Sequence, residues 1–217
     1  MKHIDFKTLA MVCGMLAPSL ANAQSCCKAQ SATESASGKP CCMLADNEVV
    51  KSIMARRSIR KYKDQQVEHE KLALIARCGI NAPSGMNQQP WAVRVVESKE
   101  FIDGTTEIFK KENAEMAQRD PNFKNMYRNA PNIIVVAAPD GGDLDVGLMG
   151  ENMMLAAQSL GLGTCCLGGP VRFLETSEAC KPYLAKLNIP DGYHISYILA
   201  VGYPDETPRP SRGTRAR

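Results

Sequence analysis

Histidine is scarce in this 217-residue chain, its net charge is small, and it has no apolar run long enough to cross a bilayer. The three histidines, His3, His69 and His194, do not stand at ligand spacing to one another, which argues against a metal site built on histidine. A formal net charge of +3 does not indicate nucleic-acid binding. A membrane-spanning helix needs about 20 apolar residues, so we expect no membrane span in the mature protein. No internal repeat is visible.

The N-terminus has the three-part order of a secretory signal. Lys2 and Lys7 give a positive start, Leu9–Leu20 is mostly apolar, and Ala21-Asn22-Ala23 places small residues at the spacing that signal peptidase accepts. The alternative is a buried N-terminal helix. We expect residues 1–23 to be a signal peptide, cleaved after Ala23, and the protein to be exported, with the periplasm as its expected location.

Residues 24–46 are rich in Ser, Ala, Gln and Lys and show no apolar periodicity, so we expect a flexible tether. The tether holds two adjacent-cysteine pairs, Cys26-Cys27 and Cys41-Cys42. In an exported protein disulfides are the default interpretation, whereas thiolates also suit Cu(I) or zinc. The pairs lack Cys-x-x-Cys spacing, so we predict no metal site. A lipoprotein anchored at Cys26 is a weaker alternative, because Gln24-Ser25 is a poor approach to such a cysteine.

Residues 47–217 are long enough for one folded domain with its own core. Apolar spacing predicts helices over 47–54, 67–77 and 99–119, a long helix capped by Asp143, and a helix over 171–187. Strands are predicted over 91–96, 131–138, 164–167 and 193–203. The run from 131 to 138 is continuously apolar, which is typical of a strand buried on both faces.

Three arginines and a serine crowd into Arg56-Arg57-Ser58-Ile59-Arg60. Guanidinium groups match phosphate oxygens two at a time, and a hydroxyl adds a neutral donor. At a helix end, Arg56 and Arg60 would face the same way and could converge on one anion. An isolated run of this kind is more often a solvated basic turn, so its meaning depends on the motifs that follow.

The second informative stretch is the loop from Asn81 to Trp91. Pro83 and Pro90 exclude regular structure, and Gly85 permits a positive φ. Four neutral hydrogen-bonding side chains lie between the prolines: Ser84, Asn87, Gln88 and Gln89. Such a loop suits an uncharged heterocycle with donors and acceptors on its edge. The alternative is an ordinary polar loop with Trp91 packed into the core.

The segment Gly161–Pro170 is a near match to the dinucleotide-binding pattern G-x-G-x-x-G. Cys166 stands where the third glycine belongs, and the segment follows a predicted helix instead of a strand, so we reject a Rossmann site. Gly168-Gly169 would leave main chain exposed at a strand end, where a flat ligand could lie. We expect Cys166 to be a small core residue instead of a redox thiol.

Together these stretches resemble the FMN-dependent nitroreductase family over residues 49–212. The resemblance rests on four motifs in order: Arg56-Arg57-Ser58-x-Arg60, Ala82-Pro83-Ser84-Gly85-x-Asn87-x-Gln89-Pro90-Trp91, Gly161-x-Gly163-Thr164-Cys165 to Gly169, and Val201-Gly202-Tyr203-Pro204 before a basic tail. It implies an α+β sandwich, in which helices flank a central, mainly antiparallel sheet. It also implies an intertwined homodimer with two FMN sites at its interface.

The resemblance assigns FMN-binding roles to four groups of residues. The phosphate, ribitol and ring edge would be held by Arg56, Arg57 and Ser58, with Arg60 beside them. The flavin of the other subunit would be reached by Pro83, Ser84, Gly85 and Asn87. One side of the ring would be lined by Leu167, Gly168 and Gly169. The phosphate site would be completed by Arg209 or Arg212.

The implied activity is transfer of hydride or electrons through flavin N5 to a flat acceptor such as a nitroaromatic or a quinone. We therefore name no side-chain acid or base. The expected donor is NAD(P)H, but predicted export conflicts with it, so a reduced exported partner or a quinol is the other candidate. The helical insert over 99–129 would be the substrate lid.

Two alternatives to this activity remain. One is flavin-linked dehalogenation or dehydrogenation on the same scaffold. The other is a non-enzymatic, exported, thiol-rich protein that binds metal through the tether cysteines.

Overall fold

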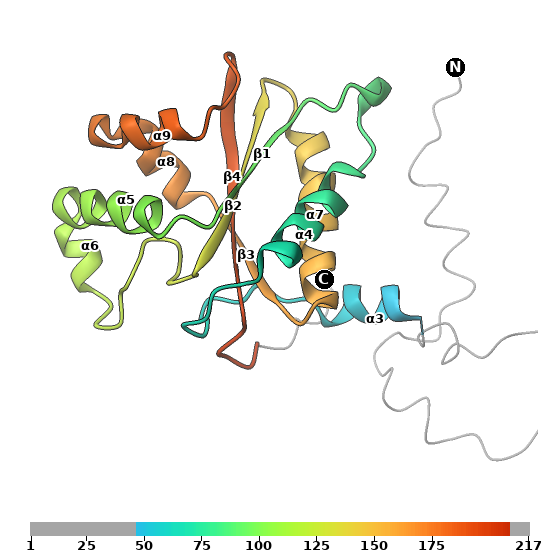
Figure 1. Cartoon of the computed structure of the whole chain (residues 1–217), viewed down its shortest axis with the longest axis horizontal. Coiled ribbons are helices and arrows are strands. Elements are labelled where there is room, and N and C mark those ends of the chain that lie inside the picture. Colours follow the sequence, from blue (N-terminus) through green and yellow to red (C-terminus); the bar gives the residue numbers. More distant parts are fainter. Residues whose placement is uncertain (1–46, 209–217) are drawn as a thin grey trace, which may run out of the picture. The chain divides into compact units, whose positions relative to one another are not determined.

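Strand β2 (Asn132–Pro139) lies at the centre of the fold, and its sequence explains why. Its continuous apolar run suits a strand covered on both faces, and seven of its eight residues are buried. β2 pairs antiparallel with β1 (Ala92–Val96) and with β4 (Tyr193–Gly202), and β4 pairs antiparallel with β3 (Gly163–Leu167). The order is β1-β2-β4-β3, and helices lie on both sides of the sheet (Figure 1).

The structure is a computed structural model that describes residues 47–208. The chain divides into two units, Met1–Val50 and Lys51–Arg217, and the fold belongs to the second. Several predictions fall outside the described residues: those for the signal peptide (1–23), the tether (24–46), Arg209 and Arg212. Within residues 47–208, no helix is long and apolar enough to cross a membrane.

One face of the sheet packs against α4 (His69–Ile80) and α7 (Asp143–Ser159). Ile134 and Val136 of β2 belong to a buried cluster on this side, together with Leu72, Ile75, Met149 and Met153. The two helices approach closely at Gly79, where a Cβ atom would lie 2.6 Å from the Cγ of Met153. The predicted cap of α7 is corrected by one residue, because the N-cap is Gly142 and Asp143 begins the helix.

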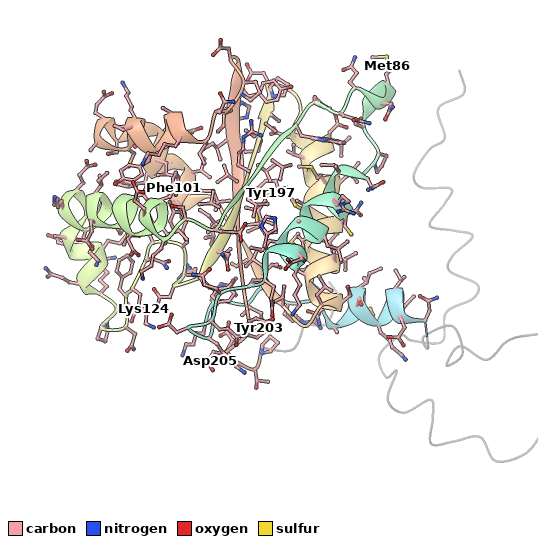
Figure 2. All side chains as sticks on the ribbon, viewed as in Figure 1. Met86, Phe101, Lys124, Tyr197, Tyr203 and Asp205 are labelled. Atoms are coloured by element: carbon pink, nitrogen blue, oxygen red, sulfur yellow. The ribbon has the colours of Figure 1, made fainter. Side chains whose placement is uncertain are left out.

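The opposite face of the sheet packs against α5 (Lys99–Glu112), α8 (Gly169–Thr176) and α9 (Lys181–Lys186). Ile133 and Val135 of β2 belong to the second buried cluster. Figure 2 shows Phe101 on this side of the sheet and Tyr197 on the other, where its hydroxyl donates to the Val146 carbonyl oxygen at 2.8 Å. Alternation along β2 therefore divides the core into two layers.

The predicted α+β class, with helices flanking a mainly antiparallel sheet, is confirmed. Helix α3 (Glu48–Ala55) forms where it was predicted. The predicted helix over 99–119 divides at Asn113 into α5 and α6 (Ala114–Gln118). The predicted helix over 171–187 divides into α8, a 3-10 turn (Glu178–Cys180) and α9. The second break follows from Ser177, which is extended with ψ 117° and so ends α8.

Candidate functional site

The arginine motif forms an extended segment along the outer side of β3. Ser58 makes a parallel bridge to Thr164, and the Ile59 N–H donates to the Thr164 carbonyl oxygen at 2.9 Å. Tyr62 makes an antiparallel bridge to Pro204. Helix α3 ends before the motif, so the helical spacing expected to bring Arg56 and Arg60 together does not apply. That expectation is wrong, because sheet pairing with β3 overrides it.

The side chains of the arginine motif diverge. Arg56 Nε is buried and lies 3.3 Å from Glu151 Oε1, an ion pair whose geometry does not make a hydrogen bond, so this N–H has no hydrogen-bond partner. Arg57 Nη1 donates to the Met54 and Arg56 carbonyl oxygens at 2.7 and 2.6 Å. Within one chain, Arg60 is the member of the motif that lines a wide groove.

This groove has a volume of about 1440 Å³ and lies between three parts of the fold. The first is the segment 60–62, together with Asp205 and Glu206. The second is the end of β3 and the start of α8, and the third is the insert that follows the middle of α5. Figure 2 shows Lys124 and Asp205, two lining residues, at the same end of the molecule. The groove is large enough for a cofactor together with a small substrate.

The end of β3 offers bare main chain to this groove, as the glycine pair predicted. Leu167 ends β3, Gly168 is the N-cap of α8, and Gly169 begins that helix. Both glycines are exposed, and a Cβ atom on either would meet no heavy atom within 4 Å. A flat ring could therefore lie against this backbone, and the three predicted residues line the same groove as Arg60.

The two cysteines of β3 behave differently. Cys165 is buried and lines the groove, and burial raises the pKa of its thiol, an effect that Arg60 and Arg128 partly oppose. Cys166 is exposed, so the expectation that it is a core residue is wrong. β3 is an edge strand, and its alternation turns Cys166 to the opposite face from Cys165, although Cys166 also lines the groove and burial also raises the pKa of its thiol.

The amide-rich loop lies far from the groove within one chain. Figure 2 shows its Met86 at the opposite end of the molecule from Lys124 and Asp205. The predicted residues Pro83, Ser84, Gly85 and Asn87 are therefore not brought together with Arg60 and the glycine pair by a single chain. A site that uses both regions needs a second copy of the chain.

The loop is nevertheless well defined. Met86, Asn87 and Gln89 have positive φ angles of 52°, 56° and 51°, whereas positive φ was expected at Gly85. The Gln89 N–H donates to Ser84 Oγ at 2.9 Å, and the Gly85 N–H donates to Asp145 Oδ1 at 3.1 Å. These bonds hold a backbone conformation that non-glycine residues seldom adopt, and such strain is concentrated at functional sites.

Several groove residues were not predicted from the sequence. The insert and α8 contribute cations and aromatic rings to the lining: Arg119, Lys124, Arg128, Arg172, Phe109, Phe123 and Phe173. The available signal was the mixture of basic and aromatic residues after Asp120-Pro121, which had been assigned only to a lid. Within residues 47–208, no group of three or more His, Cys, Asp or Glu side chains is placed to hold a metal ion.

Comparisons with known proteins agree on one family. The model of the nitroreductase family matches residues 53–203. A protein of Archaeoglobus fulgidus provisionally named NADH dehydrogenase/NAD(P)H nitroreductase is 32% identical over 167 residues, which cover 73% of this chain and 87% of that protein. The iodotyrosine deiodinase of Thermotoga neapolitana is 26% identical over 71% of this chain and 87% of its own length.

A solved structure gives the same result. The FMN-bound nitroreductase of Bacteroides fragilis superposes with a TM-score of 0.63 at 27% identity, over 77% of this chain and 97% of that one. The family model covers well over half of the sequence, and the matched region contains the arginine motif, the amide-rich loop and the glycine pair. The chain therefore belongs to the nitroreductase family.

Proposed function

We propose that this protein is an FMN-dependent oxidoreductase that passes electrons from NAD(P)H to a flat aromatic acceptor. The observation that carries the proposal is the groove that is lined both by Arg60 and by the open backbone of Gly168-Gly169. Membership of the nitroreductase family, a relative named for NAD(P)H and a similar structure with bound FMN support the same cofactor and donor.

The residues present fit FMN. The bare main chain at Gly168-Gly169 admits a flat ring, and Arg60 lies beside it with a cationic group for the ring edge. Arg56 makes no hydrogen bond through its buried Nε–H, although Glu151 Oε1 lies 3.3 Å away, and its guanidinium group is a second candidate to bind phosphate oxygens. FMN, when bound, supplies the two-electron chemistry that side chains cannot perform.

We propose that the site forms in a homodimer, because the groove and the amide-rich loop lie at opposite ends of one chain (Figure 2). The outer surfaces of α4 and α7 carry exposed apolar side chains: Leu74, Ile80, Leu144 and Leu148. Met86 in the amide-rich loop is 88% exposed. Contiguous exposed apolar residues are typical of a protein interface, and a second copy seated on these helices would bring its loop toward the groove.

For a nitroaromatic acceptor, the net reaction balances as NAD(P)H + H⁺ + ArNO₂ → NAD(P)⁺ + ArNO + H₂O. The protein's contribution is to bind and orient the flat acceptor and to keep water away from it. Phe109, Phe123 and Phe173 supply apolar lining for that purpose. A quinone acceptor would use the same surfaces, because it is also flat.

The test is an absorption spectrum of the purified protein. We expect a yellow protein whose flavin, released by denaturation and weighed by mass spectrometry, is FMN. Under anaerobic conditions NADH or NADPH should bleach the absorbance, and a nitroaromatic or a quinone should restore it. A colourless protein that takes up no added FMN would contradict the proposal.

A second candidate is reductive dehalogenation, which the similarity to iodotyrosine deiodinase favours. Its balance is ArI + NAD(P)H → ArH + NAD(P)⁺ + I⁻. Release of iodide from iodotyrosine by the reduced protein would support this candidate over nitro reduction. Flavin-linked dehydrogenation on the same scaffold is tested by running the reaction in the opposite direction, with a reduced substrate and an added electron acceptor.

We also propose export, with cleavage after Ala23 and a cysteine-containing tether over 24–46, on the grounds given by the sequence. The intact mass of protein recovered from the periplasm would identify the cleavage site. A protein that keeps residues 1–23 and stays with cytoplasmic markers would contradict export. Deleting residues 24–46 separates the enzyme from the metal-binding alternative, because FMN binding and turnover should then survive unchanged.

A further inference from the structure

The groove carries more positive charge than its own carboxylates can neutralise. Its lining includes six cationic side chains, Arg60, Lys61, Arg119, Lys124, Arg128 and Arg172, and three carboxylates, Asp120, Asp205 and Glu206. Asp120 accepts a hydrogen bond from the Asn122 N–H at 2.9 Å, and Glu206 accepts from the backbone N–H groups of Arg60 and Lys61. Two of the three carboxylates are therefore engaged by main chain.

Five of the six cations have no ion pair with any residue among 47–208: Arg60, Lys61, Arg119, Arg128 and Arg172. They contrast with Lys124, whose ammonium lies 3.1 Å from Asp64 Oδ2. Arginine presents a planar fork suited to carboxylate, sulfonate and phosphate groups. Because like charges in one groove repel each other, an anion bound among these guanidinium groups would be stabilised.

Arg128 is held in place by an ordered loop. Arg128 and Asn129 have positive φ angles of 61° and 60°. Asn129 Oδ1 accepts from the N–H groups of Lys124 and Asn125 at 2.8 and 3.0 Å, and its Nδ2 donates to the Asn122 carbonyl oxygen at 2.8 Å. These bonds fix the strained backbone, so little further ordering is needed when a ligand binds.

Aromatic rings lie on the same two elements as these cations. Phe173 follows Arg172 on α8, and Phe123 belongs to the loop that carries Arg128. Phe109 of α5 stacks on Phe123, with ring centroids 5.8 Å apart, and meets Phe173 edge-on at 5.1 Å. All three rings line the groove. A ligand that joins an aromatic body to an anionic substituent would use both kinds of surface at once.

We propose that this protein selects aromatic acceptors that carry a negatively charged substituent, which Arg128 and Arg172 bind. This inference rests on the proposed function and adds the charge class of its acceptor. Arg119, at the C-terminal end of α6, adds to the positive field of the groove. The reaction is unchanged, because the anionic group takes no part in the redox step.

The first test compares benzoate with benzamide, two unreactive compounds of similar size that differ in charge. Isothermal titration calorimetry of the FMN-loaded protein should show tighter binding of benzoate. In the double variant Arg128→Gln/Arg172→Gln, the benzoate-to-benzamide affinity ratio should fall about tenfold, the usual effect of losing a charge-assisted hydrogen bond. The matched control Lys99→Gln/Lys181→Gln removes equal charge outside the groove and should leave the ratio unchanged.

The second test measures electron transfer without a nucleotide donor, since NAD(P)H carries phosphates of its own. Protein reduced with dithionite is mixed anaerobically with 4-nitrobenzoate or 4-nitrobenzamide, and the return of flavin absorbance is followed. The rate ratio of the two acceptors should fall in the double variant by a similar factor. An unchanged ratio, or wild-type protein that binds benzoate no better than benzamide, would overturn the inference.

Loss of FMN from the double variant would also overturn it, because the two arginines would then belong to the cofactor site. The FMN content of the wild-type protein distinguishes failure of this inference from failure of the proposed function on which it rests. Wild-type protein that holds FMN and is bleached by NAD(P)H but lacks the charge preference refutes the acceptor class alone. Wild-type protein that holds no FMN contradicts the proposed function and this inference with it.

Discussion

The groove and the amide-rich loop are built in opposite ways. The groove lies between three separate parts of the fold, and sheet pairing places the segment before Arg60 beside β3, the strand that leads into the glycine pair. The loop is local: its strained residues are held by bonds to Ser84 and to Asp145 of α7, and its Met86 extends into solvent. The groove thus depends on tertiary contacts between distant segments, whereas the loop is held mainly by contacts within itself and to α7. In the proposed homodimer, the loop of one copy would complete the groove of the other.

Charge reversal in the groove should have the largest effect. Arg60→Glu should weaken FMN binding on the order of 100-fold, because a charge-assisted contact is replaced by repulsion. Arg60 is exposed, so the fold should survive. Fluorescence titration of the unloaded protein with FMN measures the change. Lys63→Glu is the matched control: it is also exposed and three residues on, yet outside the groove, and it should retain FMN.

A charge introduced on α7, the helix that contacts the amide-rich loop, tests whether FMN binding needs a second copy of the chain. Leu148 of α7 is 42% exposed, and Leu148→Glu should leave the chain folded but weaken self-association at least about tenfold, since an unpaired charge would enter the apolar interface. Light scattering and FMN titration should then change together. Ala185→Glu on α9 places the same charge on the other helical layer and should change neither. A dimer that loses no FMN affinity on dissociation would refute the shared site.

Two glycines, Gly163 in β3 and Gly168 just after it, allow an effect on folding to be distinguished from an effect on FMN binding. A Cβ atom at Gly163 would lie 2.6 Å from Ile59 Cγ1 and 2.7 Å from its Cβ, so Gly163→Ala should displace the arginine segment and cost about 1–3 kcal/mol of stability. Gly168→Ala meets no atom within 4 Å, so it should leave stability nearly unchanged. Its expected effect is weaker FMN binding. Urea unfolding and FMN titration of both variants provide the measurements, and equal loss of stability would contradict the assignment.

The smallest effect concerns a polar contact between the start of α4 and Tyr203, which directly follows β4. Glu68 accepts hydrogen bonds from the Tyr203 hydroxyl at 2.7 Å and forms an ion pair with Lys71 at 3.1 Å. Hydrogen bonds to its own backbone N–H, Tyr203 and Lys71 lower the pKa of Glu68 from 4.5 to about 2. A lowered carboxyl pKa stabilises the fold above about pH 4.5, and this contribution is lost as the pH falls toward 2.

Thermal melts from pH 2 to 7 check this prediction. Glu68→Gln should melt at a slightly lower temperature than the wild type near neutral pH, and the difference should shrink below pH 4.5. Glu70→Gln is the control, because Glu70 is the next carboxylate on α4 and is not bonded to Tyr203. A difference that stays constant down to pH 2 would show that Glu68 acts by another route.

Much of the fold could be predicted because its signals are local. The apolar run from 131 to 138 predicts a strand that is buried on both faces. The apolar spacing of α7 predicts a helix that packs against such a strand. The bare main chain of the glycine pair was also predictable, since glycine has no side chain in any fold. By contrast, the breaks at Asn113 and Ser177 depend on single backbone angles, and apolar spacing carries no information on those.

The site was harder to predict for the same physical reason. Arg56 and Arg60 looked like one helical face, but pairing of Ser58 and Ile59 with Thr164 made the segment extended and sent the two side chains to different neighbours. Cys166 looked like a core residue, but the edge position of β3 exposed it. Arg128 and Arg172 gave no motif, because they are 44 residues apart and line the same groove only through packing.

The sequence by itself determined the family, the α+β class, the central strand and the residue types that an anionic, flat cofactor requires. Those follow from local chemistry: apolar periodicity, bare glycine backbone and guanidinium groups. Only the tertiary structure decided which of those residues meet, because contacts between distant segments depend on strand pairing and helix packing. It separated the amide-rich loop from the groove within one chain, and it gathered unpaired arginines and aromatic rings around a single groove.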